Sequence, residues 1–261
     1  MNDSPSPTSP SWPTRWPKDS FTGFWTWAIA FCLTALFATG FIITLLKGSS
    51  VSYSSITPLL LYASLALQGV LEGAFVVVII LLLPRLSKFS LRELGFRAPT
   101  WGTIGVALLG SVAMVVVANG LASLIDQVLH VQHQQDVVEL FKHLHDPTAI
   151  WVFAFFAIVF APIAEETFFR LFFFNLGMRY GGFWIGAIVS GILFGMAHGD
   201  LYAAAPLALG GMILCYVYYR TRNAWASMIS HSLFNALSIL ALLVAGTAVT
   251  ILFLGRRRRR W

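Results

Sequence analysis

Long apolar runs separated by short polar connections make up most of the chain. The runs are continuously hydrophobic and do not alternate, so they predict helices rather than strands. A helix satisfies its own backbone polar groups inside a bilayer and needs roughly 20 apolar residues to span it. The pattern therefore predicts an all-α, polytopic transmembrane helical bundle. Its predicted segments are residues 24–46, 58–83, 101–125, 150–174, 183–197, 201–219 and 225–254.

The charges between these segments predict the side of the membrane on which each connection lies. Connection 84–100 holds four basic residues and one acidic residue, whereas 126–148 holds four acidic residues and one lysine. By the positive-inside rule, the first connection and the N-terminus are inside. Seven spans would place Arg256–Arg260 outside, against the same rule. We therefore expect segment 225–254 to divide near Gly246, which gives about eight helical segments.

Composition divides the chain into four regions. The first contains five prolines among serines and threonines, and it is predicted to be disordered because it offers little apolar surface to bury. The last region consists almost entirely of arginines. The predicted regions are a disordered N-terminal tail at 1–22, transmembrane helices with an outer loop at 23–148, a transmembrane core at 149–255 and a basic C-terminal tail at 256–261.

Overall composition also indicates a membrane environment. Hydrophobic residues make up 57% of the 261 residues, charged residues make up 11%, and mean hydropathy is +0.76. Soluble domains carry roughly 25% charged residues, so we expect an integral protein of the plasma membrane in contact with the lipid bilayer. The net charge is +6, and clusters of basic residues flank the apolar segments. This arrangement favours anchoring at anionic lipid over nucleic-acid binding. The two cysteines lie in apolar runs and predict neither a disulfide framework nor a zinc motif.

Ionisable residues inside apolar segments are costly and therefore mark candidate functional positions. Glu165, Glu166 and Arg170 form one such group after Pro162. On a helix, Glu166 and Arg170 are four residues apart and share a face, so we expect them to pair. Glu165 points about 100° away, which leaves it free to face a cavity. A charge cluster at a helix end is the alternative interpretation.

Two histidines and an asparagine complete the candidate site. His198 follows glycines spaced every four residues, which predict close helix packing. His231 and Asn235 are four residues apart and share one helical face. In one chemistry, Glu165 and His198 take a proton from water, while His231 and Asn235 stabilise an oxyanion. In the other, Glu165, His198 and His231 hold a divalent metal such as zinc.

Three motifs occur in a characteristic order on these segments. They are Glu-Glu-x-x-x-Arg at 165–170, Phe-x-x-x-His at 194–198 and His-x-x-x-Asn at 231–235. Together they resemble the CPBP (Abi) family of intramembrane proteases, which includes the type II CAAX prenyl endopeptidases. The resemblance covers residues 149–245 and leaves residues 1–100 without a recognisable motif.

The resemblance implies an endopeptidase that acts on a membrane-associated peptide or protein, with or without a lipid modification. Of the two chemistries we favour the one without a cofactor, because an asparagine suits an oxyanion better than a metal. The implied roles are Glu165 as the water-activating base with His198 as its partner, His231 and Asn235 as oxyanion donors, and Glu166 and Arg170 as a supporting pair.

Weaker candidates lie elsewhere in the chain. Glu72, in the second apolar segment, is interpreted as a further cavity carboxylate, a partner of an arginine or a group kept neutral by burial. Connection 126–148 holds four of the six histidines, which indicates a surface metal site or an amphipathic helix at the outer interface. Those histidines are His130, His133, His143 and His145.

A non-catalytic membrane protein is the competing hypothesis. The same buried residues can serve a scaffold or immunity protein, or a proton-coupled transporter that uses Glu72 and Glu165. A transporter is expected to show internal repeats or paired broken helices, and the sequence shows no convincing repeat. The intact set of candidate residues favours the protease.

Overall fold

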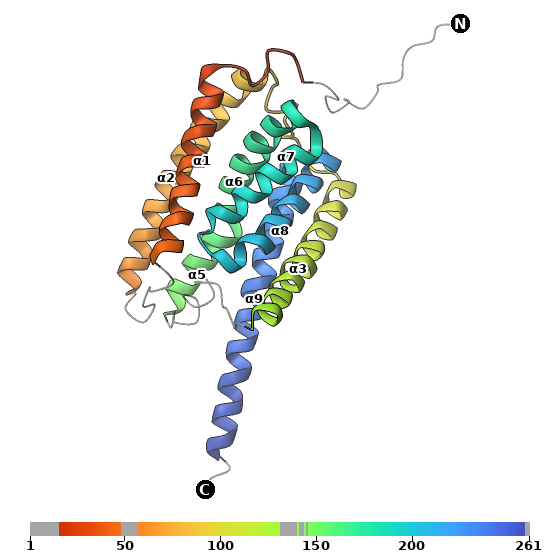
Figure 1. Cartoon of the computed structure of the whole chain (residues 1–261). Coiled ribbons are helices and arrows are strands. Elements are labelled where there is room, and N and C mark those ends of the chain that lie inside the picture. The colour runs from red at the N-terminus through yellow and green to blue at the C-terminus, as the bar shows by residue number, and fades with distance from the viewer. Residues whose placement is uncertain (1–15, 48–56, 131–139, 141–143, 145, 259–261) are drawn as a thin grey trace, which may run out of the picture.

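The computed structural model describes residues 16–47, 57–130, 140, 144 and 146–258, and all regular structure in these ranges is helical (Figure 1). Six helices in the described residues are long and apolar enough to cross a membrane. The chain is therefore an integral membrane protein built as a helical bundle. The number of candidate spans is slightly below the predicted eight segments.

Three long helices form the N-terminal half: α1 (Phe24–Lys47), α2 (Pro58–Ser87) and α3 (Trp101–Leu129). The side chains of Thr57 and Thr100 accept hydrogen bonds from backbone N–H groups in the first turns of α2 and α3, as preferred at helix N-termini. The two helices end at Lys88 and His130, which both adopt the left-handed conformation common after helix ends. Most of connection 126–148 lies outside the described residues, including His133, His143 and His145.

The fourth candidate span is a helical hairpin rather than a single crossing. It comprises α5 (Pro147–Phe155), η2 (Phe156–Phe160), α6 (Ala161–Glu166), η3 (Thr167–Phe174) and α7 (Asn175–Ala197). The chain reverses within α7 at Gly182, where φ is 71° and ψ is −170°, a conformation open essentially only to glycine. The separate predicted segments 150–174 and 183–197 are therefore the two legs of this hairpin.

Two further helices complete the bundle: α8 (Leu201–Thr221) and α9 (Ala224–Arg258). The predicted break at Gly246 is wrong, because α9 continues as one helix through that position. A helix of 35 residues rises about 52 Å, more than the roughly 30 Å of a bilayer core. Its C-terminal end lies opposite the end of the bundle at which α1 begins (Figure 1), so the charge rule did not predict the path of the last helix.

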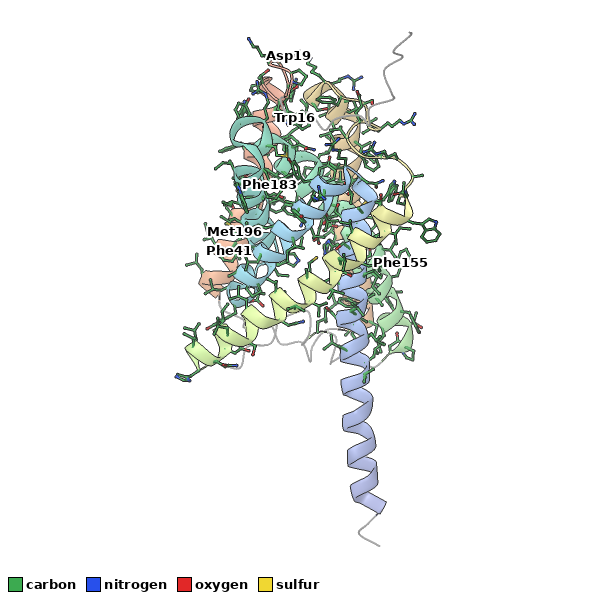
Figure 2. All side chains as sticks on the ribbon, turned by 90° about the vertical axis from the view of Figure 1, so that its right-hand side faces the viewer. Trp16, Asp19, Phe41, Phe155, Phe183 and Met196 are labelled. Carbon is green, nitrogen blue, oxygen red and sulfur yellow. The ribbon has the colours of Figure 1, made fainter. Side chains whose placement is uncertain are left out.

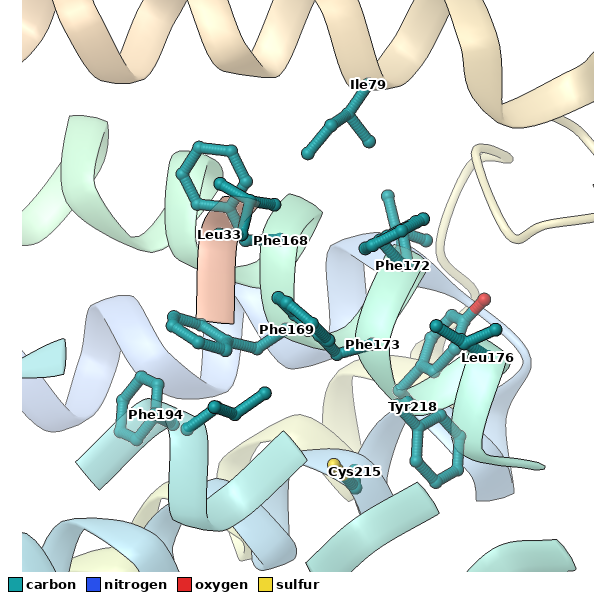
Figure 3. Packing of buried hydrophobic residues seen from close by; sticks show 14 of the residues in the cluster. Leu33, Ile79, Phe168, Phe169, Phe172, Phe173, Leu176, Phe194, Cys215 and Tyr218 are labelled. Atoms are coloured by element: carbon teal, nitrogen blue, oxygen red, sulfur yellow. The ribbon is translucent and has the colours of Figure 1, made fainter. Parts of the chain in front are cut away.

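Glycines let α7 and α8 pack closely, as the four-residue repeat predicts. A Cβ at Gly191 would lie 2.6 Å from the backbone oxygen of Ala208, and one at Gly195 would overlap the backbone oxygen of Ala204. Next to these helices, η3 contributes a run of buried phenylalanines to the central core (Figure 3). This packing fixes the hairpin that carries the candidate site.

The segment before α1 is ordered in its last residues, so the predicted tail at 1–22 is wrong for residues 16–22. Trp16 is 7% exposed and Phe21 is fully buried, and Trp16 packs edge-on against Phe21 and Phe89. Figure 2 shows Trp16 at one end of the bundle. The proline-rich composition of this segment gave no indication that Trp16 and Phe21 would pack against the bundle. Residues 1–15 lie outside the described residues.

The same end of the bundle gathers the basic connections, as the charge pattern predicts. The Arg179 side chain donates a hydrogen bond to the backbone oxygen of Lys18, and the Arg97 side chain donates one to that of Arg222. Within connection 84–100, hydrogen bonds from the side chain and backbone of Ser90 lower the pKa of Glu93. These contacts join the N-terminal segment, the hairpin turn and the connection between α8 and α9 at one membrane face.

Candidate active site

The adjacent carboxylates lie on a short α-helical stretch between two π-helical ones. Glu165 and Glu166 are the last residues of α6, which is preceded by η2 and followed by η3. π-Helical turns are rare, widen the helix locally and occur frequently at functional sites. Arg170 belongs to η3. This local geometry, which the sequence analysis missed, sets the directions of all three side chains.

Glu166 lies in a closed polar cluster. Its Oε1 atom is 3.0 Å from Nη1 of Arg170 and 3.1 Å from Nδ1 of His231. Arg170 is fully buried, and its Nη2 atom donates to the backbone oxygen of Gly211 on α8. Its guanidinium also lies over the ring of Phe194, 4.6 Å from the centroid. The predicted pairing of Glu166 with Arg170 is confirmed, and it ties α6 to α7, α8 and α9.

Glu165 has different surroundings from its neighbour. Its side chain is 20% exposed, and its Oε2 atom lies 3.9 Å from Nε2 of His231. This oxygen has no hydrogen-bond partner among the described residues. His231 thus stands between the two carboxylates, with one ring nitrogen toward each. Glu165 is therefore less enclosed by charged partners than Glu166.

His198 and His231 meet at one aromatic side chain, Phe194. The ring centroids of Phe194 and His198 are 4.8 Å apart, and those of Phe194 and His231 are 5.5 Å apart. Nδ1 of His198 bonds to the backbone oxygen of Phe194 at 2.8 Å. A carbonyl can only accept, so Nδ1 carries the proton and Nε2 is left to accept one. No hydrogen bond joins His198 directly to Glu165 in the described part of the chain.

Asn235 lies further along α9 and is half-buried. Its Nδ2 atom donates to the backbone oxygen of Ala157 in η2 at 2.7 Å. This bond uses one of its two amide hydrogens and leaves the other available. The structure therefore links Asn235 to the π-helical turn, whereas spacing alone placed it only on the same face as His231.

The candidate metal ligands do not assemble as a metal site. No group of three or more His, Cys, Asp or Glu in the described residues could hold a metal ion. Of the alternative ligand set, Glu165 and His231 approach each other. His198 contacts the ring of Phe194, which also contacts His231. The described residues therefore do not bring the three predicted ligands together as one group.

Glu72 also belongs to this neighbourhood. It interacts electrostatically with Glu165 and with His198, and its Oε1 atom accepts a hydrogen bond from Nε2 of Gln68 at 2.7 Å. Of its three sequence interpretations, a carboxylate near the site agrees with this placement. Gln68 was missed, although it lies four residues earlier on the same helix.

Comparison with known proteins agrees with the motif pattern. Residues 147–237 match the type II CAAX prenyl endopeptidase Rce1-like family. This segment contains Glu165, His198 and His231 with their motif partners, so the resemblance predicted from the motifs is confirmed. The chain is also 23% identical over 175 residues to a Bacillus subtilis (strain 168) protein described as "Putative membrane peptidase YdiL", covering 64% of this chain and 67% of that protein. No solved structure matches the chain. Residues 147–237 are thus similar to a membrane protease family.

Proposed function

We propose that this protein is an intramembrane endopeptidase in which Glu165 activates the attacking water. The observation that carries the proposal is the contrast between two adjacent carboxylates. Glu166 is buried, and its Oε1 atom is paired with both Arg170 and His231, whereas the Glu165 side chain is 20% exposed and its Oε2 atom is 3.9 Å from Nε2 of His231 and accepts no hydrogen bond among the described residues. A general base needs such an available acceptor within reach of water. The family match over 147–237 supports the same reaction class.

The reaction follows from the donors and acceptors present. Glu165 takes a proton from water as the water oxygen attacks the peptide carbonyl carbon. The proton then passes to the amide nitrogen as the carbon–nitrogen bond breaks, which yields an amine and a carboxylic acid, and the acid's remaining proton passes to Nε2 of His198 to leave a carboxylate. His198 assists as a proton acceptor, because its Nδ1 atom is committed to Phe194 and its Nε2 atom is left to accept.

His231 and Asn235 supply the proposed oxyanion donors. Glu166 accepts from Nδ1 of His231 while paired with Arg170, so Nε2 can donate only when the ring carries both protons. Asn235 contributes the amide hydrogen that Ala157 does not use. Donors fixed in a poorly solvated site stabilise developing negative charge strongly. The mechanism therefore uses the protein's own groups and no metal.

The proposed substrate is a peptide or protein at the membrane, with or without a lipid modification. The site lies on candidate spanning helices, so the scissile bond must reach it from the bilayer or its interface. The basic connections at one end of the bundle support placing that end and the N-terminus on the inner side of the plasma membrane.

The test is cleavage of a quenched peptide library, including prenylated members, by purified protein in detergent and in lipid. Wild type is compared with Glu165→Gln, and metal content is measured on the same samples. The proposal expects wild-type cleavage without stoichiometric metal and a loss of about 10²–10⁴-fold in the variant. Equal turnover by both proteins would remove Glu165 from the mechanism. Failure of wild type on every peptide, lipid-modified ones included, would favour the non-catalytic scaffold or transporter.

A further inference from the structure

Two polar residues interrupt the middle of the otherwise apolar helix α2. Gln68 and Glu72 lie between long stretches of leucine, valine and isoleucine in Pro58–Ser87. A helix of 30 residues rises about 45 Å, so both side chains lie at membrane depth. Polar and ionisable residues there are expensive and mark functional positions. Neither the family match, which begins at residue 147, nor the proposed mechanism explains them.

The geometry of α2 directs Glu72 toward the site. Val76, Ile79 and Leu83 follow it by four, seven and eleven residues, spacings that share one helical face. Ile79 is 2% exposed and Leu83 is fully buried, so this face is the inward one. Beside Glu72 the helix approaches the first leg of the hairpin closely, since a Cβ at Gly69 would meet the ring of Phe156 in η2 at 3.4 Å.

The Glu72 carboxyl group is oriented but incompletely bonded. Gln68 donates to its Oε1 atom at 2.7 Å. The Oε2 atom is buried and has no hydrogen-bond partner among the described residues. The next residue, Gly73, packs against η2, where a Cβ would meet the ring of Phe160 at 3.8 Å, and Glu72 is near enough to Glu165 and His198 for their charges to act on it. A buried acceptor without a donor is costly, and the cost is removed when a donor arrives.

An extended peptide would bring such donors to the site. Its backbone N–H groups lose water in a membrane protein, and each unsatisfied group costs several kcal/mol. We propose that Glu72, oriented by Gln68, accepts a hydrogen bond from a backbone N–H of the peptide substrate and so sets where the chain lies relative to Glu165. This inference rests on the proposed function, because it requires a peptide substrate.

The position of α2 gives the substrate a way in. In its most apolar window, 6% of residues are buried, compared with 50% for α8. Most of this helix is therefore not covered by other described parts of the protein, and Gln68 is exposed on it. A peptide that enters from the bilayer beside α2 meets Gln68 and Glu72 before it reaches Glu165.

The first experiment measures kcat and KM for Glu72→Leu and Glu72→Gln on a peptide that wild type cleaves. A binding role predicts that Glu72→Leu raises KM roughly tenfold or more, as for a lost hydrogen bond to a charged group, with kcat little changed. Glu72→Gln keeps an acceptor oxygen and is expected to show a smaller rise. The matched control is Ser64→Ala, which removes a polar group that bonds within the same helix and should leave both constants unchanged.

The second experiment removes the substrate's donor instead. Peptides in which one amide at a time is replaced by an ester lack that N–H. Wild type should show a rise in KM at one ester position, and Glu72→Leu should show no further rise at that position. Unchanged KM in folded Glu72→Leu, or the same ester sensitivity in wild type and variant, would overturn the inference while leaving Glu165 in place. If wild type cleaves no peptide, the proposed function fails and this inference fails with it.

Discussion

The two carboxyl groups at the end of α6 are chemically identical but lie in different surroundings. On the closed side, Glu166 is bound by Arg170 and His231, and each partner is anchored to another helix. On the open side, the Glu165 side chain is 20% exposed, and its Oε2 atom lies 3.9 Å from Nε2 of His231, beyond hydrogen-bond distance. Glu166 helps to hold four helices together, and Glu165 is the carboxylate proposed to react. Adjacent positions in sequence thus take structural and chemical roles through their surroundings alone.

Removing the cation from the closed side is expected to have the largest effect. Arg170→Met leaves Glu166 buried without its charge partner, which costs about 3–5 kcal/mol. We expect a protein that unfolds at lower temperature in detergent or fails to accumulate. The control is the double variant Glu166→Gln with Arg170→Met, which removes the charge pair as a unit and should recover part of the stability. A single variant as stable as wild type would show that the ion pair does not hold the site together.

His231 connects the two sides, so its replacement tests whether they act together. His231→Gln should lower kcat by roughly 10³-fold, the upper range for loss of an oxyanion donor, and should also reduce stability because Glu166 loses a hydrogen bond. Kinetics and thermal unfolding on the same sample measure both. Ser232→Ala, one residue further along α9, is the control. Full activity of folded His231→Gln would contradict the role of His231.

A smaller effect is expected for Asn235 on the open side. Asn235→Ala removes the proposed second oxyanion donor and the bond to Ala157. The expected loss in kcat is roughly 10²-fold, and the loss in stability is about 1 kcal/mol. If stability falls but kcat is unchanged, Asn235 supports η2 and takes no part in catalysis. Ser238→Ala, whose hydroxyl bonds within α9, provides the control.

Residue spacing along the helices was enough to predict some features of this molecule. The pairing of Glu166 with Arg170 follows from helical spacing, and the close packing of α7 with α8 follows from repeated glycines. The reversal at Gly182 also had a signal, because Gly181 and Gly182 form a turn-favouring pair. These features involve residues a few positions apart, so the sequence carries them directly.

Features that depend on distant contacts could not be predicted in the same way. The π-helical turns around α6 and the contact of Phe194 with two histidines arise from packing between helices. The expected break at Gly246 came from a rule about loop charge, but glycine within a helix costs only about 1 kcal/mol relative to alanine. The helix therefore continues through it. The packing of Trp16 depends on Phe89, which lies far along the chain.

The most direct test of the account compares Glu165→Gln with Glu166→Gln in one experiment. Both variants are purified beside wild type, and cleavage of a wild-type substrate and thermal unfolding are measured on each. The account predicts that Glu165→Gln loses cleavage by about 10²–10⁴-fold and unfolds like wild type, whereas Glu166→Gln unfolds at a lower temperature. Wild-type cleavage by folded Glu165→Gln would contradict the central claim that this carboxylate activates the water.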